Sequence, residues 1–254
     1  MTDRPNQRSV PRIFSHTRRQ ARFLRALGRQ QSSDPATFVF DDMVEDIVER
    51  LDFTRADPGS ALLMGDMTGQ LAPALRSRGF DVESVGPHDF DEEQPYPRTY
   101  RYVLSLGLLD TLNDLPGALM HVRHALEPGG MMIAQCLGAG TLPAMREAVQ
   151  VADGERTHAR IHPQIDRPAA SGLMSRAGFT KQVVDSRTLR ARYGDFNRLV
   201  ADLRDQGLGG ILADAPPAFT RSSWARAQAG FESLKEPDGK VSETFEILSL
   251  TGWS

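Results

Sequence analysis

The stretch from residue 61 to residue 72, ALLMGDMTGQLA, limits most strongly what this chain can fold into. An apolar run leads into two glycines, Gly65 and Gly69, and helix-forming residues follow. This order predicts a buried strand, a tight turn and the first turn of a helix. Glycines permit positive φ and close backbone approach, and the next helix presents free N–H groups. Such a turn is therefore typical of nucleotide-like cofactor sites in α/β proteins.

The rest of the chain predicts strands and helices that alternate around this turn. We expect strands near 60–64, 81–85, 102–106 and 131–136, with helices near 69–78 and 113–126 between them. The alternation indicates an α/β protein with a doubly wound, mostly parallel sheet. Further expected elements are helices near 141–153 and 167–177, strands near 179–185 and 188–193, two more helices and a final strand near 244–251.

Residues 1–52 predict an N-terminal extension, and residues 53–254 predict the main domain with a helical insertion at about 194–236. Within the extension, residues 1–11 are polar and contain prolines, which favours a mobile tail. Helices are expected near 16–30 and 38–51. The first helix is rich in arginine, so it could dock an acidic partner or present a solvated face, and we favour the solvated face.

Composition excludes several classes of function. The formal net charge of -3 argues against a general nucleic-acid binder. The single cysteine, Cys136, excludes an internal disulfide and a two-cysteine metal site, and its apolar neighbours predict a core residue. His121 and His124 lie three residues apart, but no carboxylates complete a metal site, so we predict none. No run approaches the roughly 18 apolar residues of a membrane helix. We therefore expect no integral membrane segment and a cytoplasmic protein.

Several motifs resemble those of the class I S-adenosylmethionine-dependent methyltransferases. The turn LEPGG at 126–130, which precedes an apolar strand, resembles a motif of that family. Within it, the chain is similar to the complex I assembly factors of methyltransferase fold and their bacterial relatives. It is also similar to the malonyl carrier-protein methyltransferases, less well in the C-terminal half. The pieces that match the assembly factors are NDLP at 113–116, GTL at 140–142 with Arg146, HP at 162–163, RAGF at 176–179, DLR at 202–204 and GW at 252–253.

The resemblance implies a Rossmann-like fold with S-adenosylmethionine at the carboxyl ends of the strands. It also implies either methyl transfer or hydroxylation of an arginine on a complex I subunit. When the cofactor contacts of the family are transferred position by position to this sequence, the resemblance implies contacts from five residues: Gly65, Asp66, Gly69, Gly86 and Leu106.

The cofactor positions depart from the family pattern. Leu63 stands at the acidic position of the first strand, Met67 replaces the middle glycine of the turn, and Arg101 stands where an acidic residue opens the third strand. Gly86 stands where a carboxylate holds the ribose hydroxyls, and little room follows for the adenine contacts. A left-handed Met67 would cost roughly 1–2 kcal/mol. The lost hydrogen bond to ribose forfeits roughly 1.5–3 kcal/mol. The predicted affinity thus falls by about two to four decades.

His162, Tyr193 and Arg160 are the candidate catalytic residues. The resemblance places residues 156–162 over the reactive end of the cofactor, and histidine can move a proton near neutral pH. An exposed polar loop is an equally weighted interpretation for His162, and core packing is one for Tyr193. Asp66 or Asp89 could replace a missing carboxylate.

Two functions of different class follow and stay open. The first is that of a methyltransferase-family protein with S-adenosylmethionine as cofactor, acting on a respiratory complex I subunit. The second is that of a non-catalytic assembly or binding protein that has kept the fold and lost the cofactor. The altered turn favours the second function, whereas the retained C-terminal half fits both.

Overall fold

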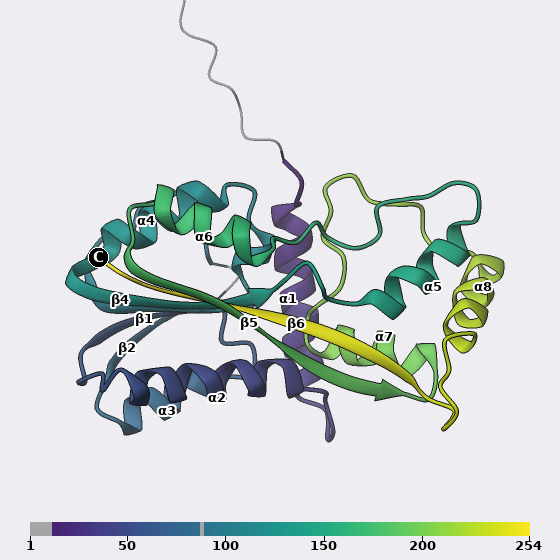
Figure 1. Cartoon of the computed structure of the whole chain (residues 1–254), viewed down its shortest axis with the longest axis horizontal. Coiled ribbons are helices and arrows are strands. Elements are labelled where there is room, and N and C mark those ends of the chain that lie inside the picture. Colours follow the sequence, from purple (N-terminus) through teal and green to yellow (C-terminus); the bar gives the residue numbers. More distant parts are fainter. Residues whose placement is uncertain (1–11, 87–88) are drawn as a thin grey trace, which may run out of the picture.

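A computed structural model describes residues 12–86 and 89–254. The tail predicted over 1–11 lies outside these described residues. The chain forms three layers, with a six-stranded sheet between two sets of helices (Figure 1). The elements are α1 (His16–Gln30), α2 (Phe38–Phe53), β1 (Ser60–Met64), α3 (Leu71–Ser77), β2 (Asp81–Val85), β3 (Tyr100–Leu106), the 3-10 turn η1 (Leu109–Thr111), α4 (Leu115–Ala125), β4 (Leu126–Leu137), α5 (Pro143–Asp153), α6 (Arg167–Arg176), β5 (Thr180–Tyr193), α7 (Phe196–Asp205), α8 (Arg221–Glu232) and β6 (Val241–Trp253).

The strand order is β2-β1-β3-β4-β6-β5. Strands β1 to β4 are parallel, whereas β6 runs antiparallel between β4 and β5. Because β2 and β3 lie on opposite sides of β1, the winding reverses at the carboxyl end of β1, where open α/β sheets bind their ligands. The predicted doubly wound, mostly parallel α/β sheet is confirmed.

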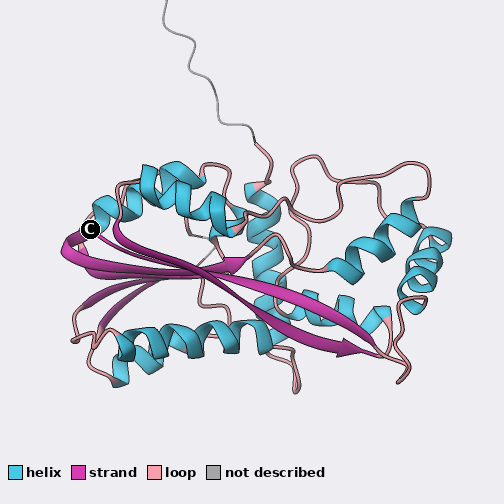
Figure 2. Cartoon of the chain, in the orientation of Figure 1, coloured by secondary structure: helices cyan, strands magenta, loops and turns pink. Residues whose placement is uncertain are grey.

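Both faces of the parallel strands are buried, which explains their apolar sequences. Along β1, Ala61 and Leu63 face one core, and Leu62 and Met64 face the other. Helices α2 and α3 cover the first face, and α4 and α6 cover the second (Figure 2). Helices α1, α5, α7 and α8 extend the first core beyond the carboxyl ends of the strands. The buried Cys136 belongs to the second core, as predicted.

Two sequence predictions about strands are wrong. The strands expected at 179–185 and 188–193 are one edge strand, β5, which pairs with β6 along its length. The fourth strand begins at Leu126 rather than at Met131, because Leu126 pairs with Tyr100 before a bulge restores the register. The two C-terminal helices, α7 and α8, lie within the predicted insertion. The proposed boundary between residues 52 and 53 stays a prediction.

Candidate functional site

The turn after β1 has the glycine geometry that the sequence predicts. Gly65 has φ 85°, and a Cβ there would lie 2.2 Å from the carbonyl oxygen of Leu106. Only glycine therefore lets β1 end this close to β3. Gly69 has φ 69°, and a Cβ there would meet no atom within 4 Å. The two glycines thus have different roles. Gly65 allows the close approach of the β1 and β3 backbones, whereas the space beside the Gly69 Cα is not filled by other atoms of the described residues.

The side chain of Asp66 contacts the first turn of α3. Its Oδ2 accepts a hydrogen bond of 3.0 Å from the N–H of Ala72, so the protein's own carboxylate takes a group that an anionic ligand would use. Two buried polar atoms of the turn, Asp66 Oδ1 and Thr68 Oγ1, have no hydrogen-bond partner within the described part of the chain. A bound ligand could supply the hydrogen bonds that these two atoms lack.

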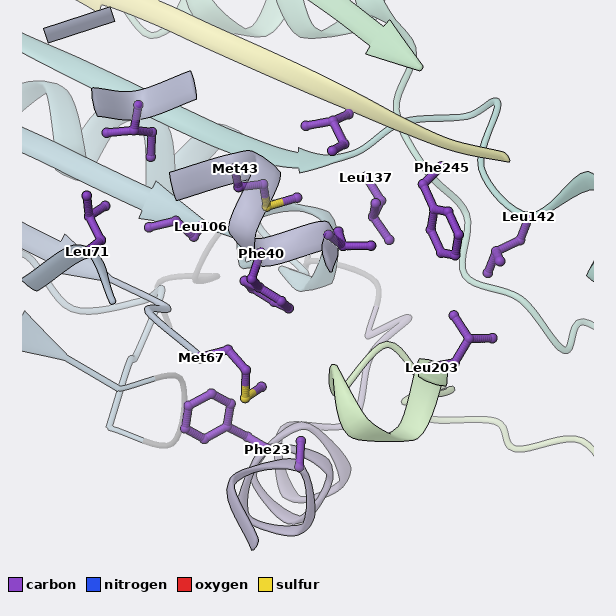
Figure 3. Close-up of a cluster of buried hydrophobic side chains, with 14 of the residues drawn as sticks. Phe23, Phe40, Met43, Met67, Leu71, Leu106, Leu137, Leu142, Leu203 and Phe245 are labelled. Carbon is purple, nitrogen blue, oxygen red and sulfur yellow. The ribbon is translucent and has the colours of Figure 1, made fainter. Parts of the chain in front are cut away.

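Met67 closes the space above the turn with an apolar side chain. It is 6% exposed and lies between Phe23 of α1 and Phe40 of α2 (Figure 3). Leu106, at the end of β3, belongs to the same cluster. The φ angle of Met67 is not positive, so the predicted left-handed strain is wrong. Met67 departs from the family pattern through its packing rather than through its backbone.

Neighbouring glycines show how closely this cluster is packed. A Cβ on Gly107, which follows β3, would lie 2.9 Å from the ring of Phe40. A Cβ on Gly207, which follows α7, would lie 2.8 Å from the Cε of Met67. The helices α1 and α2 and the turn at Gly207 are therefore in direct contact with the carboxyl ends of β1 and β3.

The described end of β2 carries a glycine where the resemblance expects a carboxylate. Gly86 follows the strand, and its carbonyl accepts hydrogen bonds from the N–H groups of Asp89 and Phe90 at 2.9 and 3.1 Å. Residues 89–99 form turns and bends, without helix or strand, and no described strand lies outside β2. Asp89 itself is exposed. Among the described residues at this sheet edge, neither Gly86 nor a further strand supplies the contacts that the resemblance assigns to ribose and adenine.

A buried ion pair fixes the segment after β2 to the first helix. Arg19 of α1 and Glu92 are 2.6 Å apart, with side chains 2% and 8% exposed. Arg19 also donates to the carbonyls of Phe90 and Thr111. Burial alone would raise the pKa of Glu92, but the hydrogen bond from Arg19 brings the pKa below its usual value. The N-terminal helix is thus built into the core beside the carboxyl ends of β1 and β3.

The cofactor contacts that the resemblance assigns to Gly65, Asp66, Gly69, Gly86 and Leu106 stay predictions, and the packing around the turn bears on them. The cofactor presents an amino acid, a ribose and a charged sulfur, all of which need polar partners. The space above the turn is instead filled by Met67, Phe23 and Phe40, and neither Leu63 nor Gly86 supplies a carboxylate.

A cavity of about 230 Å³ lies beside this closed space, on the side of the C-terminal helices. Its walls come from the residues after β3 and β4, from α5, α7 and α8, and from the loops at 160–164 and 208–210. The lining is mainly apolar, with Leu142, Met145, Phe196 and Trp224 among its residues. Gly107 contributes to this cavity, whereas residues 65–69 do not.

Two of the three catalytic candidates line this cavity, and both already have structural partners. The Nε2 of the buried His162 accepts a hydrogen bond of 2.8 Å from the N–H of Ile211. Burial, with the charges of Arg22 and Arg146, lowers the pKa of His162 to about 4, so the ring is neutral at pH 7. Arg160 donates to Asp153 at 2.8 Å. It also donates to the carbonyl of residue 217 and stacks on the ring of residue 219.

Tyr193, the third candidate, does not line the cavity. It ends β5 and is 3% exposed. Burial, together with the charge of Asp202, raises the pKa of its hydroxyl above the usual value. The catalytic roles of His162, Arg160 and Tyr193 stay predictions.

Sequence reasoning missed two charged residues of the cavity, Asp110 and Arg22. Asp110 belongs to η1, and burial raises its pKa to about 6, although Arg22 opposes the rise. Its Oδ1 is buried and has no hydrogen-bond partner among the described residues. Burial lowers the pKa of Arg22 to about 10. Arg22 donates to the carbonyl of Gly209 at 3.0 Å. The position of Asp110, just beyond the carboxyl end of β3, is the signal that could have identified it.

Two negative findings also concern the described residues. No helix in the described ranges is long and apolar enough to cross a membrane. Residues 12–86 and 89–254 contain no cluster of three or more histidine, cysteine, aspartate or glutamate side chains that could hold a metal ion.

The three-layer fold, its strand order and the glycine turn define a Rossmann-like class I methyltransferase fold. The sequence profile of the family described as "Methyltransferase domain" matches residues 36–184, more than half of the chain. The chain therefore belongs to the methyltransferase-domain family.

Curated relatives and a solved structure agree with this assignment. The chain is 28% identical over 179 residues to the mitochondrial arginine-hydroxylase NDUFAF5 of Rattus norvegicus, covering 68% of this chain and 52% of that protein. It is 24% identical over 220 residues to malonyl-[acyl-carrier protein] O-methyltransferase 1 of Coxiella burnetii, covering 80% and 76%. The chain thus spans about half the length of the NDUFAF5 relative.

The fold is similar to that of a solved phosphoethanolamine N-methyltransferase 2 of Haemonchus contortus, in complex with phosphomonomethylethanolamine and S-adenosylhomocysteine. The TM-score is 0.50 at 14% identity, over 83% of this chain and 52% of that chain. At this identity the likeness shows the fold alone.

Proposed function

We propose that this member of the methyltransferase-domain family is a non-catalytic binding protein that has lost S-adenosylmethionine and acts through the cavity beside α5, α7 and α8. The observation that carries the proposal is the packing of Met67 between Phe23 and Phe40, above the carboxyl ends of β1 and β3. In that place a methyl-transferring relative would need room and polar partners for its cofactor.

Two free-energy terms support this proposal. Taking Met67 out of its apolar surroundings would cost roughly 1.5–3 kcal/mol. Without a carboxylate at Gly86, a further 1.5–3 kcal/mol or so of hydrogen bonding to ribose is lost. The sum of about 3–6 kcal/mol corresponds to roughly two to four decades in affinity. A site with a Kd of about 1 μM would then have a Kd of about 0.1–10 mM.

The partner we propose is a subunit of a respiratory complex. This rests on the similarity to the assembly-factor family and on the relative named NDUFAF5. Arginine hydroxylation is the activity in the name of that relative, and this chain spans about half of its length. The cytoplasmic location and the lack of a nucleic-acid partner stay proposals that rest on composition.

Titration calorimetry with S-adenosylmethionine and S-adenosylhomocysteine tests the loss of the cofactor. We expect the wild-type chain to show no binding with a Kd below about 0.1 mM. Micromolar binding would refute the proposal. The Met67→Gly variant, which empties the space above the turn, serves as the control for a site that is blocked only by this side chain.

A complementation assay tests the biological half of the proposal. In cells that lack the wild-type gene, a Gly69→Arg variant places a large side chain in the turn at a position where an added Cβ meets no atom within 4 Å. We expect the variant to restore the phenotype as well as the wild type does. Loss of rescue by a variant that is folded and expressed would show that the turn still has a ligand.

The second candidate function is S-adenosylmethionine-dependent modification of a protein. It is favoured by membership of the family and by the two buried polar atoms, Asp66 Oδ1 and Thr68 Oγ1, that have no partner within residues 12–86 and 89–254. A bound ligand could satisfy both atoms. The calorimetric titration separates the two candidates directly.

A further inference from the structure

A second cavity of about 340 Å³ adjoins the apolar one at the surface. Four residues line both cavities: Arg22, Arg204, Gly209 and Gly210. The second cavity therefore forms the mouth of the first. The two differ sharply in chemistry, because four of the seven residues that line the mouth are arginines.

Two helices supply the arginines of the mouth. Arg22, Arg25 and Arg29 lie three and four residues apart on α1 and so share one face of that helix. Arg204 comes from the last turn of α7. These positions concentrate positive charge on one small area of a chain whose formal net charge is -3.

Not all of this charge is neutralised by the protein. Arg29 pairs with Asp205 at 2.9 Å, and Arg22 donates to the carbonyl of Gly209. Arg25 and Arg204 are exposed, and neither forms an ion pair or a side-chain hydrogen bond with any other residue of the described ranges. These two guanidinium groups are therefore available to an anion.

The inner cavity offers an apolar surface to the rest of such a ligand. The rings of Phe196 and Trp224 are 5.1 Å apart, and those of Phe219 and Trp224 are 5.6 Å apart, so aromatic side chains form one wall. Leu142 and Met145 are also part of the lining. The volume of about 230 Å³ exceeds the space of a few water molecules, each of which takes about 30 Å³ in the liquid.

We propose that the two cavities together bind an anionic amphiphile, with a carboxylate or phosphate head between Arg25 and Arg204 and an aliphatic or aromatic body against Phe196 and Trp224. The inference deepens the proposed function, because it assigns a ligand class to the same cavity. Asp110 lines the inner cavity, and its carboxylate would repel an anionic head group there. The head group is therefore expected at the mouth, with the apolar body in the inner cavity.

Direct binding of four matched probes tests the proposal: octanoate, octyl phosphate, octanol and octylamine. A change in tryptophan fluorescence, measured in a Trp253→Phe background so that Trp224 alone is seen, reports occupancy of the inner cavity, and titration calorimetry gives the affinity. We expect octanoate or octyl phosphate to bind at least tenfold more tightly than octanol. The ratio of the Kd values for octanoate and octyl phosphate identifies the preferred head group. Equal binding of octanol and the anions would overturn the role of the arginines, and preferential binding of octylamine would assign the cavity to a cation held by Asp110.

Two arginine variants localise the head group. Arg25→Gln and Arg204→Gln should each weaken anion binding by about tenfold, because each removes one charged hydrogen-bond donor. Arg190→Gln is the matched control, since Arg190 is an exposed arginine of β5 that lines neither cavity. Unchanged affinity in both mouth variants would refute the proposal. Failure of all probes to bind would also refute it, yet would leave the loss of S-adenosylmethionine intact, since that is measured in a separate titration.

Discussion

Asp110→Asn should stabilise the protein at pH 7.5 and have little effect near pH 4. The Asp110 carboxyl is buried beside the cavity, and its pKa is raised from 3.8 to about 6. The folded state therefore holds the Asp110 proton more tightly than the unfolded state does. Asparagine is of similar shape and carries no charge, so it mimics the protonated carboxyl at every pH.

The size of the effect follows from linkage between protonation and folding. Below pH 3.8 the carboxyl is protonated in both states, and the group contributes no penalty. As the pH rises from about 4 to about 6, the unfolded state loses its proton first, and the wild-type protein loses stability. A rise in pKa to about 6 corresponds to about 3 kcal/mol at 1.4 kcal/mol per unit. Because the asparagine amide also needs hydrogen-bond partners, we expect a gain of about 1–3 kcal/mol at pH 7.5.

Urea unfolding of the wild type and the variant at pH 4, 5, 6 and 7.5 measures the difference. Asp153→Asn provides a control of opposite sign. The hydrogen bond from Arg160 lowers the pKa of Asp153, so this variant should lose stability at pH 7.5 and lose less near pH 3. If Asp110→Asn gave the same difference at every pH, or destabilised the protein at pH 7.5, the assignment of Asp110 as a buried carboxyl with a raised pKa would be refuted.

Three further predictions concern the core and the cavity wall. Met67→Ala should lower the free energy of unfolding, measured in urea, by about 2–5 kcal/mol. The control Met120→Ala, at a side chain that is 48% exposed, should change it by less than about 0.5 kcal/mol. Equal effects of the two variants would contradict the packing of Met67. Glu92→Gln should cost about 3–5 kcal/mol, because it leaves Arg19 buried without its ion-pair partner, and a loss under about 1 kcal/mol would contradict this. Nuclear magnetic resonance of His162 should show a neutral ring from pH 8 to pH 5, since its pKa is about 4; a midpoint near pH 6.5 would contradict its burial.

The parallel part of the fold could be predicted because its strands are buried on both faces. Runs such as 61–64 and 102–106 are mainly apolar, which indicates strands buried on both faces. Gly65 and Gly69 indicate the turn that follows the first of these strands. The edge strand β5 is harder to predict from the sequence. One of its faces is half exposed, and polar residues near Ser186 suggested a break where the pairing with β6 continues.

The candidate site could be predicted only in part. The loss of carboxylates at Leu63 and Gly86 is visible in the sequence, but the direction of the Met67 side chain depends on α1 and α2, which come from another part of the chain. Arg22 and Asp110 meet through the same tertiary packing. Residues that approach each other only after folding leave no local pattern for sequence reasoning to detect.

The cluster of Met67, Phe23 and Phe40 also changes how the amount of folded protein would respond to metabolism. An enzyme that binds its cofactor is stabilised by mass action, by about 2.7 kcal/mol when the free ligand is at 100 times its Kd. Such an enzyme becomes more vulnerable to proteolysis whenever the ligand is scarce. Here side chains of the chain itself supply the contacts at that place. On the proposed loss of S-adenosylmethionine, the half-life of this protein in the cell should not follow the supply of methyl donor.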